Sequence, residues 1–245
     1  MARFPNNNPF GGISSSQPLN YQAAGSEVSV AQFFNAVYAW MAAGLGLTAV
    51  VAYWVAAQGS YMHILNPGSL IVLFLVQLAL VWTISGAINK INATVATVLF
   101  LLYAALNGMT LSVLFLLYTK SALASTFFVT AGVFGAMSLY GYVTKRDLTQ
   151  LGSLLFMALF GIILASIVNI FVASSGLQWI ITYAAVLIFV GLTAYDTQKL
   201  KMIALQTGGN PALAHRLAIV GSLQLYLDFI NLFILLLRIM NDRRN

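Results

Sequence analysis

The sequence predicts an all-α membrane protein in which seven helices cross the bilayer. Of its 245 residues, 60% are hydrophobic and only 7% are charged, whereas soluble domains carry roughly 25% charged residues. Its mean hydropathy is +0.90. The hydrophobic residues form long runs, and a run of about 20 residues is enough for a helix to cross the ~30 Å hydrocarbon layer. These observations exclude an ordinary soluble domain.

The segment before the first hydrophobic run, residues 1–29, has a different composition. It is rich in Asn, Ser, Gly, Pro and Gln, as in FPNNNPFGGISSSQP, and it lacks the basic and hydrophobic regions of a signal peptide. A segment with so few large apolar residues cannot bury enough surface to fold alone. We therefore expect a disordered, polar N-terminal tail on the cytoplasmic side.

Residues 30–245 form one seven-helix transmembrane domain, because the connections between the hydrophobic runs are short. The last run has a start signal of its own, with Asn210 as N-cap and Pro211 in the first helical turn. A helix that begins there is longer than the hydrocarbon layer is thick, so one of its ends must project. The predicted spans are residues 33–57, 69–88, 94–117, 123–144, 151–173, 178–198 and 216–239.

Positive charges in the short loops predict the orientation of these spans. With the N-terminus inside, the inner loops hold six Lys or Arg residues and the outer loops hold Lys120 alone. This count favours a cytoplasmic N-terminus and an external C-terminus. The basic C-terminal tail argues the other way, and six spans with one re-entrant segment would return it to the cytoplasm. With the seven spans, the inner side collects Arg3, Lys90, Lys145, Arg146, Lys199, Lys201 and Arg216, and the outer side Lys120, Arg238, Arg243 and Arg244. Because most of these charges lie in loops, they indicate topology rather than nucleic-acid binding.

Two acidic residues lie within predicted spans and are the candidate functional residues. Asp196 is on the sixth span and Asp228 on the seventh, where an ionisable side chain is costly and normally faces a water-filled cavity or a partner. The spacing of Gln224 and Asn231 from Asp228 places all three on one face of the last helix. Thr193 precedes Asp196 by one turn. The other acids, Glu27, Asp147 and Asp242, lie in tails or a loop.

Other polar and small residues in the spans have a structural explanation. Gln77, Asn107 and Asn169 suit hydrogen bonds between helices, and the small pairs Ala131/Gly135 and Gly132/Ala136 suit helix contacts. The chain has no cysteine, and its two histidines lie in opposite loops. No P-loop, nucleophile elbow or zinc-protease motif is present. We therefore expect neither an enzyme nor a bound cofactor.

Three segments resemble the Bax-inhibitor (transmembrane Bax-inhibitor-motif) family in its bacterial YccA-like branch. They are GLTAYDTQKLK around Asp196, LYLDFINLFILLLRIM around Asp228, and LNGMTLSVLFLLY at 106–118. The resemblance implies a bundle with the last helix at the centre, surrounded by the other six, in a bacterial inner membrane. It also implies that Asp196 and Asp228 form a pH-sensing pair on a calcium-leak pathway. In relatives a basic residue near the second span latches onto the sixth-span aspartate, and Lys90 in GAINKIN is the nearby cation.

The chemistry of two carboxylates is compatible with that role. Two such groups in a low-dielectric cavity cannot both ionise cheaply, so we expect them to share a proton. They would bind calcium weakly, with Gln224 or Asn231 adding carbonyl oxygens. The same residues can relay protons in exchange for a cation. A different hypothesis is a non-transporting regulator that binds a membrane-anchored AAA protease or another membrane partner through its N-terminal tail. In a third, the pair is only structural.

Overall fold

The computed structural model describes residues 19–59, 66–86, 91–206 and 211–242, and the regular structure in these ranges is all helical. Seven of the described helical segments are long and apolar enough to cross a membrane. The fold class predicted from the sequence is therefore confirmed. The helices are α1 (Leu19–Ala57), α3 (Pro67–Gly86), α4 (Ala93–Leu111), α5 (Leu114–Leu117), α6 (Lys120–Val143), α7 (Thr149–Val172), α8 (Ser175–Gln206) and α9 (Pro211–Asp242).

The helix ends differ most from the predicted spans at the start of α1, at the end of α8 and at the start of α9. α1 begins at Leu19, inside the segment predicted to be a tail, and residues 1–18 lie outside the described ranges. α8 continues to Gln206 rather than ending at residue 198. The charges of Lys199 and Lys201 predict a membrane boundary there, but lysine is a good helix former and both residues continue the helix. α9 begins at Pro211, as the start signal predicts.

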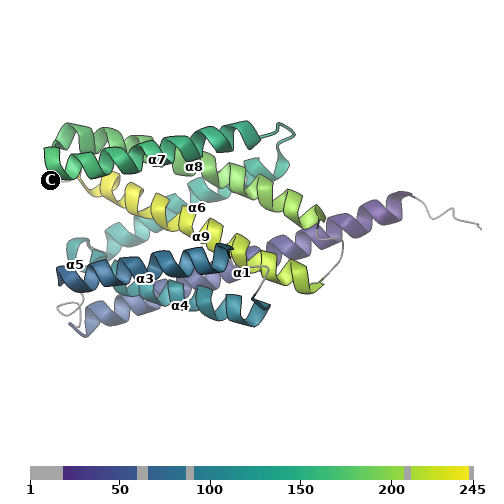
Figure 1. Ribbon diagram of the computed structural model, residues 1–245, viewed down its shortest axis with the longest axis horizontal. Helices are drawn as coiled ribbons and strands as arrows, with labels where there is room; N and C mark the ends of the chain where they lie inside the picture. The colour runs from purple at the N-terminus through teal and green to yellow at the C-terminus, as the bar shows by residue number, and fades with distance from the viewer. Residues whose placement is uncertain (1–18, 60–65, 87–90, 207–210, 243–245) are drawn as a thin grey trace, which may run out of the picture.

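The helices form two layers with α9 between them (Figure 1). α7 packs against α8 in one layer, and α3 packs against α4 in the other. α9 crosses between the layers and packs against α1, α4, α6 and α8. In its most apolar stretch 56% of the residues are buried, against 6% for α7 and 11% for α3. α9 is thus an inner helix, while its encirclement by all six others stays a prediction.

Hydrogen bonds between polar side chains tie several of these helices together. The Tyr226 hydroxyl on α9 lies 2.7 Å from the Thr48 hydroxyl on α1, and it accepts a 2.8 Å hydrogen bond from the Asn107 amide on α4. Gln77 on α3 donates to Thr110 on α4 at 2.8 Å. The structural role predicted for Asn107 and Gln77 is therefore confirmed. Asn169 serves instead as a local cap, because it accepts from the Ser174 backbone N–H.

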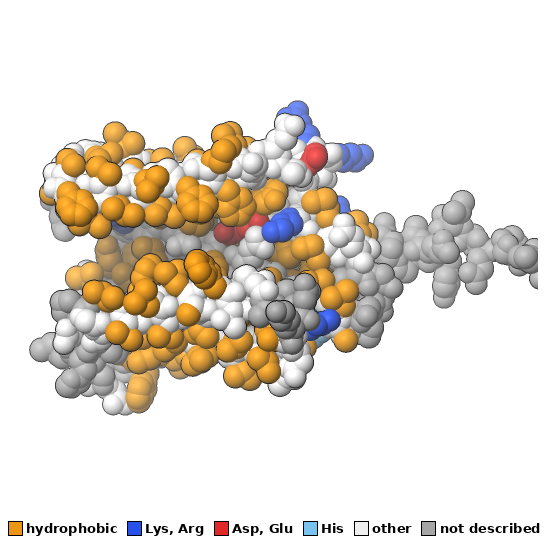
Figure 2. Space-filling model, in the orientation of Figure 1, with side chains coloured by type: hydrophobic (Ala, Val, Ile, Leu, Met, Phe, Trp, Pro, Cys, Tyr) orange, Lys and Arg blue, Asp and Glu red, His pale blue; other side chains and the backbone are white. Residues whose placement is uncertain are grey.

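Basic residues gather at one end of the bundle, which we call the basic end. It carries the connection between α6 and α7, the end of α8 and the start of α9, and Figure 2 shows Lys and Arg side chains grouped there. Lys120 and Arg238 lie at the opposite end. Loops rich in positive charge face the cytoplasm in most membrane proteins. The cytoplasmic location of the basic end stays a prediction. The described residues of the basic end are Lys145, Arg146, Lys199, Lys201 and Arg216.

Candidate functional site: a buried pair of aspartates

The structure brings the two membrane aspartates together. Asp196 on α8 is 2% exposed and Asp228 on α9 is 5% exposed. Their carboxyl groups are hydrogen-bonding neighbours. A carboxylate is only an acceptor, so a hydrogen bond between two carboxyl groups requires a proton on one of them. The geometry therefore suits a pair that holds one proton between two side chains.

A close approach of α8 and α9 makes this contact possible. A Cβ atom added at Gly221 of α9 would lie 2.6 Å from Cδ2 of Leu200 on α8, which is closer than real Cβ contacts allow. Leu200 lies one turn after Asp196 on α8, and Gly221 lies two turns before Asp228 on α9. The two helices run antiparallel, so the missing side chain at Gly221 lets them meet beside the carboxyl pair.

The pair has few other polar neighbours. The Gln224 side chain, one turn before Asp228, forms a hydrogen bond with Asp196, and the charge of Lys199 also acts on Asp196. One oxygen of each carboxyl group, Oδ1 of Asp196 and Oδ2 of Asp228, is buried without a hydrogen-bond partner among the described residues. Buried acceptors in native proteins normally have a partner. These two oxygens are available to a proton, a water molecule or a cation.

The remaining residues predicted for the site have other contacts. The Thr193 hydroxyl donates to the carbonyl of Phe189 at 2.8 Å, within α8. The Asn231 side-chain NH₂ group donates to the carbonyl of Leu227 at 2.9 Å, within α9. The side-chain oxygen of Asn231 takes no part in this hydrogen bond. Lys90, predicted as a latch, lies outside the described residues, so its role stays a prediction.

The polar residues that follow Asp196 each contact a different neighbour. The Thr197 hydroxyl lies 2.9 Å from that of Ser138 on α6. The Gln198 side chain donates to the carbonyl of Arg146 and accepts from the N–H of Leu148, both at 2.8 Å. Lys201 Nζ donates to a carbonyl of α6 at 2.8 Å. Sequence analysis singled out the aspartate and missed these contacts. Consecutive polar residues cannot all face lipid, so DTQKLK carried a signal for polar surroundings on several sides of the helix.

A crevice of about 690 Å³ lies between α7, α8 and α9 in the half of the bundle away from the basic end, and neither aspartate is among its lining residues. At its inner end is Asn231, one turn beyond Asp228. At its mouth the Arg238 guanidinium donates to the Gln178 side-chain oxygen at 2.9 and 2.6 Å, with that amide oriented to accept. Acidic atoms are visible in Figure 2 in the depression between the two helix layers. The polar residues that line the crevice are Ser166, Asn169, Gln178, Thr182, Asn231 and Arg238.

The described chain contains no cluster of three or more His, Cys, Asp or Glu side chains that could hold a metal ion. A cation at the aspartate pair would therefore have two carboxyl groups and neutral oxygens as ligands. Calcium takes six to eight oxygen ligands in its protein sites. The arrangement suits weak, transient binding rather than a storage site.

Comparison with known proteins identifies the family. A family model described as "Inhibitor of apoptosis-promoting Bax1" matches residues 30–245, which is most of the chain and includes both aspartates. The chain belongs to the Bax-inhibitor family. As a family member with seven helices able to cross a bilayer, it is an integral membrane protein.

Three bacterial proteins are similar to the chain over nearly its whole length. The inner membrane protein YbhL of Escherichia coli K12 is 53% identical over 224 residues, which cover 90% of this chain and 94% of YbhL. An uncharacterized protein of Borreliella burgdorferi is 47% identical over 216 residues, covering 87% and 93% of the two chains. Another, from Deinococcus radiodurans, is 45% identical over 214 residues, covering 87% and 92%.

Proposed function

We propose that the protein is a pH-sensitive calcium-leak channel of the bacterial inner membrane, with Asp196 and Asp228 acting as one proton-sensitive cation site. The observation that carries the proposal is the buried contact between the two carboxyl groups, each with one oxygen left without a partner. A structural hydrogen bond does not need an ionisable group, let alone two. The name of YbhL supports the inner membrane as the location.

Protonation sets the charge of the site. With one shared proton the pair carries a charge of −1, loss of that proton gives −2, and gain of a second gives zero. The groups that act on the pair are the neutral Gln224 amide and the Lys199 ammonium, while the Tyr195 ring packs against Phe156 of α7 and its phenol interacts with Asp196 only through charge. Protons and a cation compete for the same oxygens, so acidification lowers the attraction for the cation. We therefore expect calcium flux to fall as the pH is lowered.

The crevice between α7, α8 and α9 is the access route in this proposal. The Ser166 and Thr182 hydroxyls donate to carbonyls of their own helices at 2.8 Å, which leaves their oxygen lone pairs as acceptors toward the crevice. Calcium prefers such oxygen ligands. Among the described side chains, Arg238 at the mouth pairs with the neutral Gln178, and its positive charge opposes the entry of cations. Oxygen ligands along the crevice together with a repelling charge at its mouth favour a slow calcium leak.

Calcium flux into proteoliposomes of the purified protein, measured from pH 5 to pH 8, tests the proposal. We expect flux above that of protein-free liposomes, with a decrease toward acidic pH. A proton gradient that drives calcium uphill would instead identify an exchanger. Flux equal to that of protein-free liposomes at every pH would refute transport and leave the regulatory hypothesis.

The regulatory hypothesis places function in the N-terminal segment. In it the protein binds a membrane-anchored AAA protease or another membrane partner, without transport. Deletion of residues 1–18, which precede α1, separates the two hypotheses. A channel should keep its flux in liposomes after the deletion, whereas a regulator should lose its effect in cells.

A further inference from the structure

A long crevice separates α1 from α6 on the side of the bundle away from α7. These two helices are not among the closely packed helix pairs of the described chain. One hollow of about 620 Å³ lies toward the basic end, and a second of about 360 Å³ lies toward the opposite end. Leu45 and Phe229 line both hollows, so the two hollows adjoin each other. Because α1 and α6 are both long and apolar enough to cross the membrane, a crevice between them lies at the level of the hydrocarbon.

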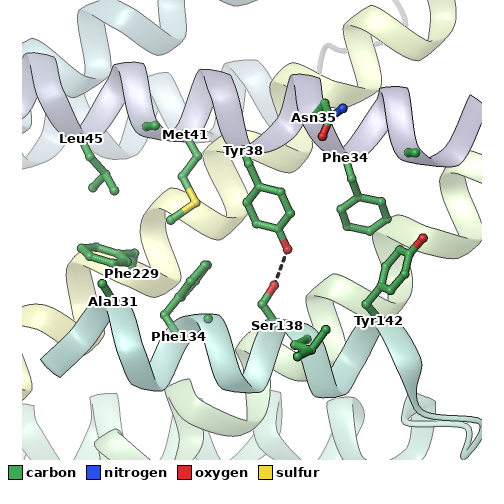
Figure 3. A pocket seen from close by; sticks show the side chains of 14 residues that line it. Phe34, Asn35, Tyr38, Met41, Leu45, Ala131, Phe134, Ser138, Tyr142 and Phe229 are labelled. Carbon is green, nitrogen blue, oxygen red and sulfur yellow. Dashed lines mark hydrogen bonds between the residues drawn. The ribbon is translucent and has the colours of Figure 1, made fainter. Parts of the chain in front are cut away.

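The crevice is largely apolar, and a hydrogen bond and a ring contact between α1 and α6 bridge it. Its floor is Phe229 of α9, and Figure 3 shows aromatic and aliphatic side chains of α1 and α6 on its two sides. The Tyr38 hydroxyl on α1 forms a hydrogen bond with the Ser138 hydroxyl on α6 across the gap. At the end nearest the basic residues, the rings of Phe34 and Tyr142 pack edge to face, with their centroids 5.1 Å apart.

Small residues on α6 keep the crevice open. A Cβ atom added at Gly135 would meet nothing within 4 Å, and Gly135 lines the larger hollow. A Cβ atom added at Gly132 would also meet nothing within 4 Å, but Gly132 does not line the hollow. The helix contact predicted for the pairs that contain these glycines is therefore not made at either position within the described chain. Gly135 opens instead onto the larger hollow.

The end of the crevice at Tyr142 is positively charged. Lys201 Nζ lies 4.8 Å from the centre of the Tyr142 ring. Lys145 and Arg146, both exposed, follow within four residues of Tyr142 in the chain, with Asp147 as the only acid beside them. Basic pockets between transmembrane helices on the cytoplasmic side bind the headgroups of anionic lipids. The other end of the crevice has Lys120 as its lining cation.

We infer that the crevice holds an acyl chain of an anionic phospholipid, with the phosphate of the headgroup against Lys145, Arg146 and Lys201. The two hollows are too small to enclose a membrane-spanning helix, which favours a thinner occupant. A helix about 10 Å wide that crosses ~30 Å of hydrocarbon takes up roughly 2,400 Å³, far more than the 620 and 360 Å³ of the two hollows. A single hydrocarbon chain is only as wide as one aliphatic side chain. This lipid site does not depend on the proposed channel function.

The test is native mass spectrometry of the protein released from nanodiscs that contain equal amounts of phosphatidylglycerol and phosphatidylcholine. We expect one retained lipid per protein, mostly phosphatidylglycerol. Gly135→Leu fills the hollow and should reduce the retained lipid at least fivefold. Gly132→Leu adds the same side chain to the same helix outside the hollow and should leave retention unchanged.

Two further variants make the test decisive. Ala131→Leu also narrows the hollow and replaces Gly135→Leu if that variant does not fold. Lys145→Gln with Arg146→Gln should keep a lipid but weaken the preference for phosphatidylglycerol by roughly fivefold per cation removed. Equal retention in the wild type and in the filled variants would overturn the proposal. So would a second protein chain, rather than lipid, in the released complex.

Discussion

Asp196 of α8 and Asp228 of α9 lie carboxyl to carboxyl inside the helix bundle. Both side chains are almost fully buried, and each leaves one oxygen without a partner in the described part of the chain. Two carboxylates held this closely cannot both ionise without a large electrostatic cost. The pair is therefore a natural place for one proton and, when that proton leaves, for a cation.

Gly221→Leu should force α8 and α9 apart beside the pair. The added side chain has no room because Leu200 occupies the space where even a Cβ atom would lie. Overpacking of this kind costs about 1–3 kcal/mol of unfolding free energy. Thermal unfolding in detergent should show a lower midpoint, and the pH dependence of calcium flux should weaken. The matched control is Gly161→Leu on α7, where a Cβ atom meets nothing within 4 Å. Equal stability of the two variants would show that the close approach is not required.

Tyr226→Phe should destabilise the contact of α9 with α1 and α4. The substitution removes the hydroxyl that binds Thr48 and Asn107 and leaves the buried Asn107 amide without that partner. A buried polar group without a partner costs about 1–3 kcal/mol. Thermal unfolding of the purified protein measures this loss. Tyr183→Phe, at a position that is 44% exposed, is the control and should unfold like the wild type. A Tyr226→Phe variant as stable as the control would contradict this assignment.

Arg238→Gln should increase the calcium leak severalfold. The substitution removes a positive charge from the mouth of the crevice between α7, α8 and α9 while it keeps a polar side chain beside Gln178. Flux into proteoliposomes is the measurement. Lys120→Gln removes a charge at the same end of the bundle but outside this crevice and should have little effect. If both variants leak alike, the crevice is not the entrance.

Lys90→Ala tests the predicted latch. If Lys90 offsets the charge of Asp196 and holds the second span against the sixth, its removal should raise the leak near neutral pH. Lys120→Ala, at the opposite end of the bundle, should not. The same flux assay measures both variants. An equal leak in the two would remove Lys90 from the mechanism.

The sequence predicted the number of spans and the two candidate aspartates because both signals are local. Hydrophobic runs identify helices, and an ionisable residue inside such a run is conspicuous. Contacts between helices are not local. The bonding roles of Gln77 and Asn107 could still be predicted, whereas the contacts of Thr197, Gln198 and Lys201 were missed. The length of α8 was underestimated because lysines mark membrane boundaries in most chains, whereas Lys201 here binds a backbone carbonyl of α6. Likewise, the small residues around Gly135 predicted a helix contact, and only the packed structure shows an open hollow there.

The most direct test of the shared proton is a double-mutant cycle on calcium flux between pH 5 and pH 8, with Asp196→Asn, Asp228→Asn and the double variant. Asp147→Asn is the control, because hydrogen bonds from the side chain and backbone of Thr149 lower the pKa of this exposed loop carboxyl, so it stays ionised over this range. We predict that each single substitution abolishes the pH dependence, that the double variant does no more than either single one, and that Asp147→Asn behaves like the wild type. Additive effects of the two substitutions would mean two independent sites and would contradict the shared proton.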